Sequence, residues 1–116
     1  MGKVTPLHQN RPILALRQSE AEAIIRRRIT DENTANVIFT DHAWDRVSER
    51  DITREDVFKV LRTGHCNEEP FQNEKKNWQV TIVKRMSGRR EVGVVTIILD
   101  NDEKLVIRTV EWMDLR

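Results

Sequence analysis

An imidazole and two guanidinium groups recur at four-residue spacing in the middle of the chain, at His42, Arg46 and Arg50. On an α-helix, residues four apart differ by only about 40° around the axis, so these side chains form one stripe. An imidazole titrates near neutral pH and can transfer a proton, and arginines can offset the charge of a phosphate. A helix with such an edge beside its buried face can hold these groups still at the rim of a cleft. Such spacing also occurs on ordinary surface helices, and that interpretation stays open.

A further guanidinium, that of Arg108, lies in an otherwise apolar segment. With strict strand alternation, Arg108 shares a face with Val106 and Val110. Burial of an unpaired charge is costly. We therefore expect Arg108 either to pair internally, with an acidic residue in the neighbourhood of Glu91 or Glu111, or to point into a site where an anion binds.

Other candidates for contact with RNA lie in or beside the expected strands. Lysine and arginine can contact phosphates, and tryptophan rings can stack on bases. Both tryptophans also stand in strand register with apolar neighbours, which favours a position in the core. The candidate phosphate- and base-contacting residues are Lys84, Arg85, Arg89, Arg90, Trp78 and Trp112.

The overall charge gives no general drive toward nucleic acid. The chain has 20 Lys and Arg against 19 Asp and Glu, a formal net charge of +1. Any phosphate binding must therefore come from local clusters. One cluster, Arg26 to Arg28, falls at the expected C-terminus of a helix, where cations offset the helix dipole. That position explains the triplet without a ligand.

The single cysteine, Cys66, excludes an intramolecular disulfide and is typical of a reducing, cytoplasmic compartment. With His65 beside it there are too few ligands for a structural zinc site, and the sequence has no HxxxH, HxE or carboxylate cluster. We expect neither a metal nor another cofactor. Polar residues interrupt the apolar residues within 1–17, so we expect no signal peptide and no membrane-spanning helix.

Two helices are predicted in the first half of the chain. The first extends from Ile13 or Ser19 to about Ile29, with Ser19 resembling an N-cap. The second follows Thr40, a good N-cap, and should end near Arg50. This second helix carries the candidate stripe.

A third helix has the most distinct start signal. Thr53 can cap it with Asp56 at the third helical position, while Ile52 and Val57 occupy the two positions of a hydrophobic staple. Gly64 is well situated as a left-handed C-cap.

The second half of the chain has the pattern of strands. Residues 65–76 are polar and predict an irregular crossing, and strands are predicted over 78–85, 92–99 and 105–112.

The order of these elements predicts an α+β fold. The N-terminal helices should pack on one face of a C-terminal antiparallel β-meander. The apolar run 37–39 is expected only to lead into the second helix. At 116 residues the chain should form one compact domain, in which residues 1–36 are an N-terminal arm and helix and residues 37–116 the α+β domain.

Three segments together resemble a small bacterial family known only as domain of unknown function 4258. They are Phe39 to Arg50, Asp51 to Gly64, and Gly93 to Thr96 with Val106 to Trp112. That family resembles the RelE-type toxins, ribonucleases of toxin–antitoxin systems with a RelE/barnase-like α+β fold. The resemblance spans about Val37 to Asp114.

The resemblance implies specific roles. His42 and Arg46 match the family's His-Ala and Arg signature, Arg50 matches its second Arg, and Thr109 matches the polar residue of the closing strand. With Arg108, these residues form the expected catalytic set. The closing strand lacks the Tyr or His that RelE-type toxins carry there, so the proton-transfer group must come from elsewhere.

The function expected from this resemblance is metal-independent cleavage of RNA by attack of a 2′-hydroxyl. Its partners would be RNA, including mRNA on the ribosome, and a cognate antitoxin protein. The alternative is a non-catalytic module that binds nucleic acid or protein through the His-Arg-Arg stripe and needs no proton transfer. The sequence predicts no oligomeric state.

Overall fold

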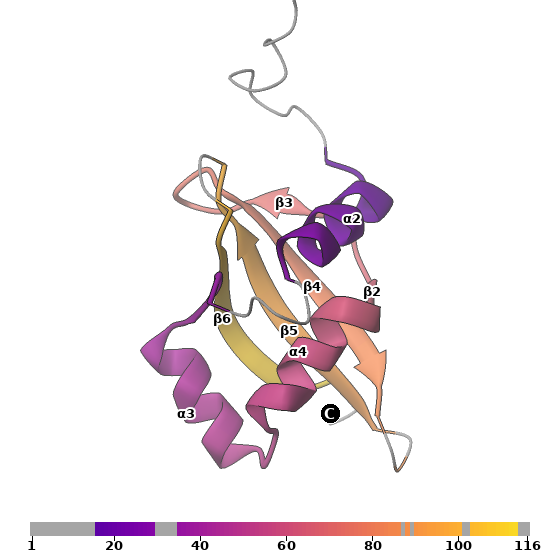
Figure 1. The fold of residues 1–116 in the computed structure, drawn as a ribbon, viewed down its shortest axis with the longest axis vertical. Helices are drawn as coiled ribbons and strands as arrows, with labels where there is room; N and C mark the ends of the chain where they lie inside the picture. The colour runs from indigo at the N-terminus through magenta and orange to yellow at the C-terminus, as the bar shows by residue number, and fades with distance from the viewer. Residues whose placement is uncertain (1–15, 30–34, 87, 89, 101–102, 114–116) are drawn as a thin grey trace, which may run out of the picture.

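The computed structural model of the chain describes residues 16–29, 35–86, 88, 90–100 and 103–113, and within them it forms three helices and one six-stranded mixed sheet (Figure 1). The predicted α+β class is confirmed. The helices precede the three long strands along the chain. In order, the elements are α2 (Gln18–Arg28), β1 (Val37–Phe39), α3 (Asp41–Glu49), α4 (Arg54–Thr63), β2 (His65–Cys66), β3 (Phe71–Gln72), β4 (Trp78–Arg85), β5 (Glu91–Ile98) and β6 (Leu105–Trp112).

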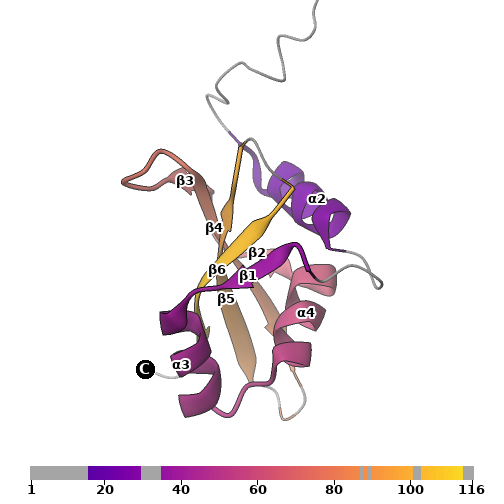
Figure 2. The same cartoon turned by 60° about the vertical axis from the view of Figure 1, so that its left-hand side comes forward.

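The sheet has the strand order β1-β6-β5-β4-β2, and β3 pairs with the start of β4. Helices α2 and α4 lie over one face, whereas α3 lies beside β6 at the edge of the sheet (Figures 1 and 2). The core forms between the sheet and the helices. Its fully buried side chains include Ile25 of α2, Leu61 of α4, Ile82 of β4 and Ile107 of β6.

The antiparallel meander predicted from the sequence is only part of the sheet. Strands β4, β5 and β6 form it, but Val37–Phe39 is a strand that pairs in parallel with β6. The prediction treated this segment as a lead into α3, because three apolar residues carry no signal of their pairing partner. The parallel pairing makes the sheet mixed and fixes where α3 begins.

Both local start signals before α3 and α4 are confirmed. The Thr40 hydroxyl accepts a hydrogen bond from the backbone N–H of Ala43 at 3.0 Å. In α4, Thr53 and Asp56 form the reciprocal capping box, with both hydrogen bonds at 3.0 Å. The two staple residues before and within α4 are buried, at 2% and 0% exposure for Ile52 and Val57.

Two predicted helix ends are wrong in detail. Ser19 is not an N-cap, because α2 begins at Gln18 after Arg17, whose N–H donates to Glu20 at 2.9 Å. Gly64 ends α4 with φ −84°, so it is not left-handed. Glycine is required there for space: a Cβ would lie 2.6 Å from the carbonyl oxygens of Val60 and Val83.

Strand β6 does not alternate strictly. Thr96 of β5 pairs with Ile107, but its neighbour Val95 pairs with Thr109, so Arg108 is an extra residue in a β-bulge. The bulge reverses the alternation, and Ile107 and Val110 both face the helices. The predicted grouping of Arg108 with Val110 on one face is therefore wrong.

Among the described residues, no helix covers the face of the sheet opposite α2 and α4, which is called the helix-free face. The side chains of directly paired residues point to the same face of a sheet, so the strand register shows which residues lie on this face. It is built of polar and β-branched side chains and carries Gln79, Thr81, Val95, Ile97 and Thr109.

Candidate functional site

Helix α3 runs alongside β6 because a hydrogen bond fixes each of its ends. At its start, the Thr40 hydroxyl donates to the carbonyl oxygen of Arg108 at 3.2 Å. At its end, the indole N–H of Trp112 donates to the carbonyl oxygen of Arg50 at 3.0 Å. The helix thus occupies the edge position that β1 leaves free after Phe39. Its stripe of basic side chains extends from the bulge of β6 to the end of that strand.

The orientation of the stripe follows from the packing of α3. Trp44 lies on one flank, where its ring stacks on Phe39 at a centroid distance of 4.3 Å, and Phe39 in turn contacts Phe58 of α4 at 6.2 Å. His42 lies two residues from Trp44, about 200° around the helix, so it falls on the opposite flank. Arg46 shares that flank. The stripe therefore faces away from α4, toward the side of the helix-free face.

The guanidinium of Arg108 crosses the helix-free face. Its Nη1 donates to Oε1 of Gln79 at 2.8 Å, and its Nη2 lies 3.4 Å from Oε2 of Glu74. Arg108 is thus paired within the protein, which is one of the two alternatives predicted from the sequence. Its partner is Glu74 rather than a residue near Glu91 or Glu111, because the hairpin between β3 and β4 brings Glu74 to β6.

The electrostatics of this pair favour its charged form. Two interactions lower the pKa of the Glu74 carboxyl: a hydrogen bond from the backbone N–H of Glu74 itself, and the nearby guanidinium of Arg108. Both side chains remain accessible, with exposed fractions of 43% for Arg108 and 65% for Glu74. The site therefore presents one guanidinium and one carboxylate to solvent.

Three other residues of the predicted catalytic set lie on β6 and α3. Thr109 follows Arg108 on β6 and shares the helix-free face with Val95. His42 is exposed in the first turn of α3, close in sequence to the capping Thr40. Arg46 forms an ion pair with Glu49 on the same helix.

The structure divides the predicted site into two ends. Arg108, Thr109 and the start of α3 form one end. Arg50 lies at the other, where the Arg90 guanidinium lies 3.9 Å from the centre of the Trp112 ring. The two ends are joined by α3, which is about 14 Å long at 1.5 Å for each of its nine residues.

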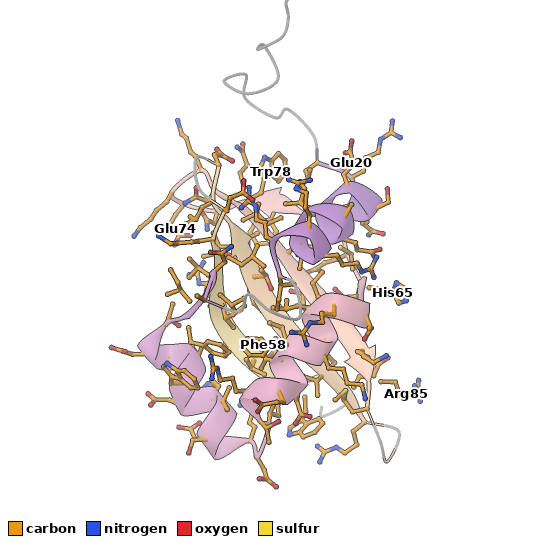
Figure 3. All side chains as sticks on the ribbon, viewed as in Figure 1. Glu20, Phe58, His65, Glu74, Trp78 and Arg85 are labelled. Carbon is orange, nitrogen blue, oxygen red and sulfur yellow. The ribbon has the colours of Figure 1, made fainter. Side chains whose placement is uncertain are left out.

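The remaining basic candidates belong to the second end or lie beyond it. Lys84 pairs across the sheet with Val92, the strand neighbour of Trp112. Arg85 lies 3.9 Å from Glu91 and points away from the side on which Glu74 lies (Figure 3). Arg89 is outside the described residues.

Trp78 is not available to stack on a base. The residue is only 6% exposed and lies in the core, on the face covered by the helices (Figure 3). This is the core position that its strand register favoured, so Trp78 is removed from the candidate site. Trp112 is partly buried against the core, with Arg90 over its ring.

The arginine triplet of α2 has structural partners. Arg26 donates to the carbonyl oxygens of Arg62 and Gly64 at 3.0 and 2.6 Å. Arg28 is buried and donates to the carbonyl oxygen of Leu99 at 2.8 Å. These contacts tie α2 to the end of α4 and to the connection after β5, and they account for two members of the triplet without phosphate.

Sequence reasoning missed the two partners of Arg108. Gln79 is the polar residue between Trp78 and Val80, so strand alternation already assigned it to the face opposite the core. Glu74 lies in the segment predicted to be irregular, and nothing in its immediate neighbours indicates the contact with Arg108.

In the described part of the chain, no group of three or more His, Cys, Asp or Glu side chains lies together as a metal site. None of the described helices has the length and apolar character needed to cross a membrane.

The fold and site define an α+β domain in which an edge helix with an exposed His-Arg stripe borders the bulged last strand of a mixed sheet. Residues 39–112 match a family described as Domain of unknown function (DUF4258), and the chain belongs to this family. The match begins at the end of β1 and includes α3, α4 and the three long strands. No curated protein and no solved structure shows significant similarity to the chain.

Proposed function

We propose that this protein is a metal-independent endoribonuclease and acts as the toxin of a toxin–antitoxin pair. The observation that supports it most directly is the hydrogen bond from the Thr40 hydroxyl to the carbonyl of Arg108. It joins the start of the helix that bears His42 to the strand that bears Arg108. A proton-transfer group and a phosphate-binding cation from distant parts of the chain thereby border the same edge of the sheet.

In the proposed reaction, His42 removes the proton from a ribose 2′-hydroxyl, and the 2′-oxygen attacks the adjacent phosphorus. The bond to the 5′-oxygen breaks and that oxygen takes up a proton from water, which leaves a 2′,3′-cyclic phosphate and a 5′-hydroxyl. Arg46 and Arg108 offset the negative charge of the pentavalent phosphorane. Thr109, next to Arg108, donates a hydrogen bond to a phosphate oxygen.

The second end of α3 extends the proposed RNA path. A single strand that follows α3 passes from Arg108 to Arg50 and then meets Arg90 and Lys84. Phosphate contacts of this kind add affinity without sequence preference. In this proposal the far cations hold the strand, and the first end performs the chemistry.

The proposed partners follow from the same surface. RNA is the substrate, including mRNA on the ribosome. An antitoxin protein with acidic side chains would cover the stripe of α3 and complement its charge. Co-expression of this partner should restore growth to cells that the lone protein arrests.

A binding module without catalysis is the second candidate. The observation that favours it is that Arg46 and Arg108 are each already paired with a carboxylate, Glu49 and Glu74. A module of this kind would use the stripe as a docking surface for nucleic acid or protein. Proton transfer by His42 would then have no role.

The experiment that separates the two candidates is expression in bacteria followed by mapping of RNA 5′ ends. The ribonuclease predicts growth arrest and new fragments with 5′-hydroxyl ends, and the His42→Ala variant should produce neither. The binding module predicts that His42→Ala and the wild-type protein behave alike and that no new 5′-hydroxyl ends arise.

A further inference from the structure

The turn between β3 and β4 is built by Asn73. Its side-chain Oδ1 accepts hydrogen bonds from the backbone N–H groups of Lys75 at 2.9 Å and Asn77 at 3.1 Å. Its own N–H donates to the carbonyl oxygen of Asn77, and its carbonyl accepts from Lys76. The Glu74 side chain has no part in these bonds, so the turn does not depend on it.

Gln79 fixes the direction of the Arg108 guanidinium. Gln79 is only 9% exposed as a residue, and its Oε1 accepts from Arg108 at 2.8 Å and from Nδ2 of Asn73 at 3.4 Å. A nearly buried amide has few alternative rotamers, so it holds the guanidinium over the helix-free face. The donors on Nη2 remain directed at an outside acceptor.

That outside acceptor is the Glu74 carboxylate, at 3.4 Å. A carboxylate and a phosphate both offer negatively charged oxygens to the fork of an arginine. The Glu74 carboxylate is 65% exposed, and ion pairs between exposed groups contribute little net stability. Another anion can therefore displace Glu74 at low cost while Gln79 keeps Arg108 in position.

We propose that Arg108, held by Gln79, is a subsite for one phosphate of single-stranded RNA, and that Glu74 occupies this subsite until RNA displaces it. The inference rests on the proposed function for its substrate class. It adds that the hairpin turn carries an internal competitor of the substrate. Removal of the Glu74 charge should therefore strengthen RNA binding, and only when Arg108 is present.

The test measures binding of a fluorescently labelled single-stranded RNA whose 2′-hydroxyls are methylated, so that it cannot be cleaved. Glu74→Gln removes the competing charge, Arg108→Met removes the subsite, and the double variant closes the cycle. Glu68→Gln is the matched control, because it removes one exposed carboxylate elsewhere in the chain. Inorganic phosphate is titrated against each variant in a separate arm.

We expect Glu74→Gln to bind RNA about two- to fivefold more tightly, the range that an exposed ion pair provides. Arg108→Met should weaken binding about tenfold. Glu74→Gln should have no effect in the Arg108→Met background, and Glu68→Gln should change the affinity by less than Glu74→Gln does. Circular dichroism of each variant confirms that the fold is intact.

Three results would overturn the proposal. They are an equal gain from Glu74→Gln with and without Arg108, binding of inorganic phosphate at Arg108 without binding of the RNA, and no RNA binding by any variant. The proposed function is judged separately, with unmodified RNA. Coupled binding without cleavage supports the phosphate subsite and contradicts the ribonuclease, whereas cleavage without coupling contradicts only the role of Glu74.

Discussion

The hydroxyl of Thr40 donates a hydrogen bond to the carbonyl oxygen of Arg108 at 3.2 Å while it accepts one from the N–H of Ala43 at 3.0 Å. One side chain thus caps α3 and attaches it to the bulge of β6. This bond adds to the parallel pairing of β1 with β6, which also ties the start of the helix that bears His42 to the strand that bears Arg108.

Thr40→Val is expected to lower the free energy of unfolding by about 1 to 2 kcal/mol, because it removes the N-cap of α3 together with the bond to Arg108. Thr40→Ser keeps the hydroxyl and should retain most of the stability. Urea denaturation of the three proteins measures the effect. An unchanged midpoint for Thr40→Val would mean that α3 is held in another way.

Gly64→Ala is expected to destabilise the fold by about 3 kcal/mol, since overpacking of this kind forces backbone shifts. The new methyl group would lie 2.6 Å from two carbonyl oxygens, those of Val60 and Val83. Gly88→Ala is the matched control: its φ is +79°, but nothing lies within 4 Å of the added Cβ. The control should lose only about 1 kcal/mol, from left-handed strain. Equal losses in thermal unfolding would contradict the steric explanation.

Cys66 is expected to react slowly with thiol reagents in the folded protein. Burial and the neighbouring Glu22 raise the pKa of its thiol to about 12, against an ordinary value of 9.0. A difference of three units lowers the thiolate fraction at pH 8 about a thousandfold. The rate of disulfide exchange with an aromatic disulfide reagent measures this, with urea-unfolded protein as the reference. Folded protein that reacts as fast as unfolded protein would contradict the assignment.

The same shift predicts the direction of a pH effect on stability. The folded thiol keeps its proton at a pH where the unfolded thiol has lost it, so its contribution is complete below pH 9 and is lost as the pH rises toward 12. Cys66→Ala should show a smaller loss of stability between pH 9 and 10.5 than the wild-type protein. An equal loss in both would show that other groups dominate.

The part of the fold that depends on local signals was predictable. Thr40 and Thr53 marked two helix starts because capping is an interaction within one turn. The three long strands were visible in their β-branched composition. The parallel pairing of β1 was not predictable, because Val37 and its partner Leu105 are distant in sequence and three apolar residues fit many partners.

The site was predictable in its residues but not in its contacts. The spacing of His42 and Arg46 gave the stripe, and the charge of Arg108 among apolar residues indicated that it needed a partner. A bulge shifts the register by one residue without a mark in the sequence, so the side on which Arg108 emerges could not be derived. The partner Glu74 depends on how the hairpin curls over the sheet, a tertiary property.

The central claim is that His42 transfers a proton in RNA cleavage, and the most direct measurement is cleavage of end-labelled RNA by the purified protein in EDTA, with and without ribosomes. His65→Ala is the matched control, since it removes an imidazole that is 76% exposed on β2, away from Glu74 and the site (Figure 3). Cutting is expected from the wild-type protein and from His65→Ala, with a loss of about a hundredfold or more for His42→Ala. Equal cutting by both histidine variants, or no cutting by folded wild-type protein in either condition, would contradict this claim.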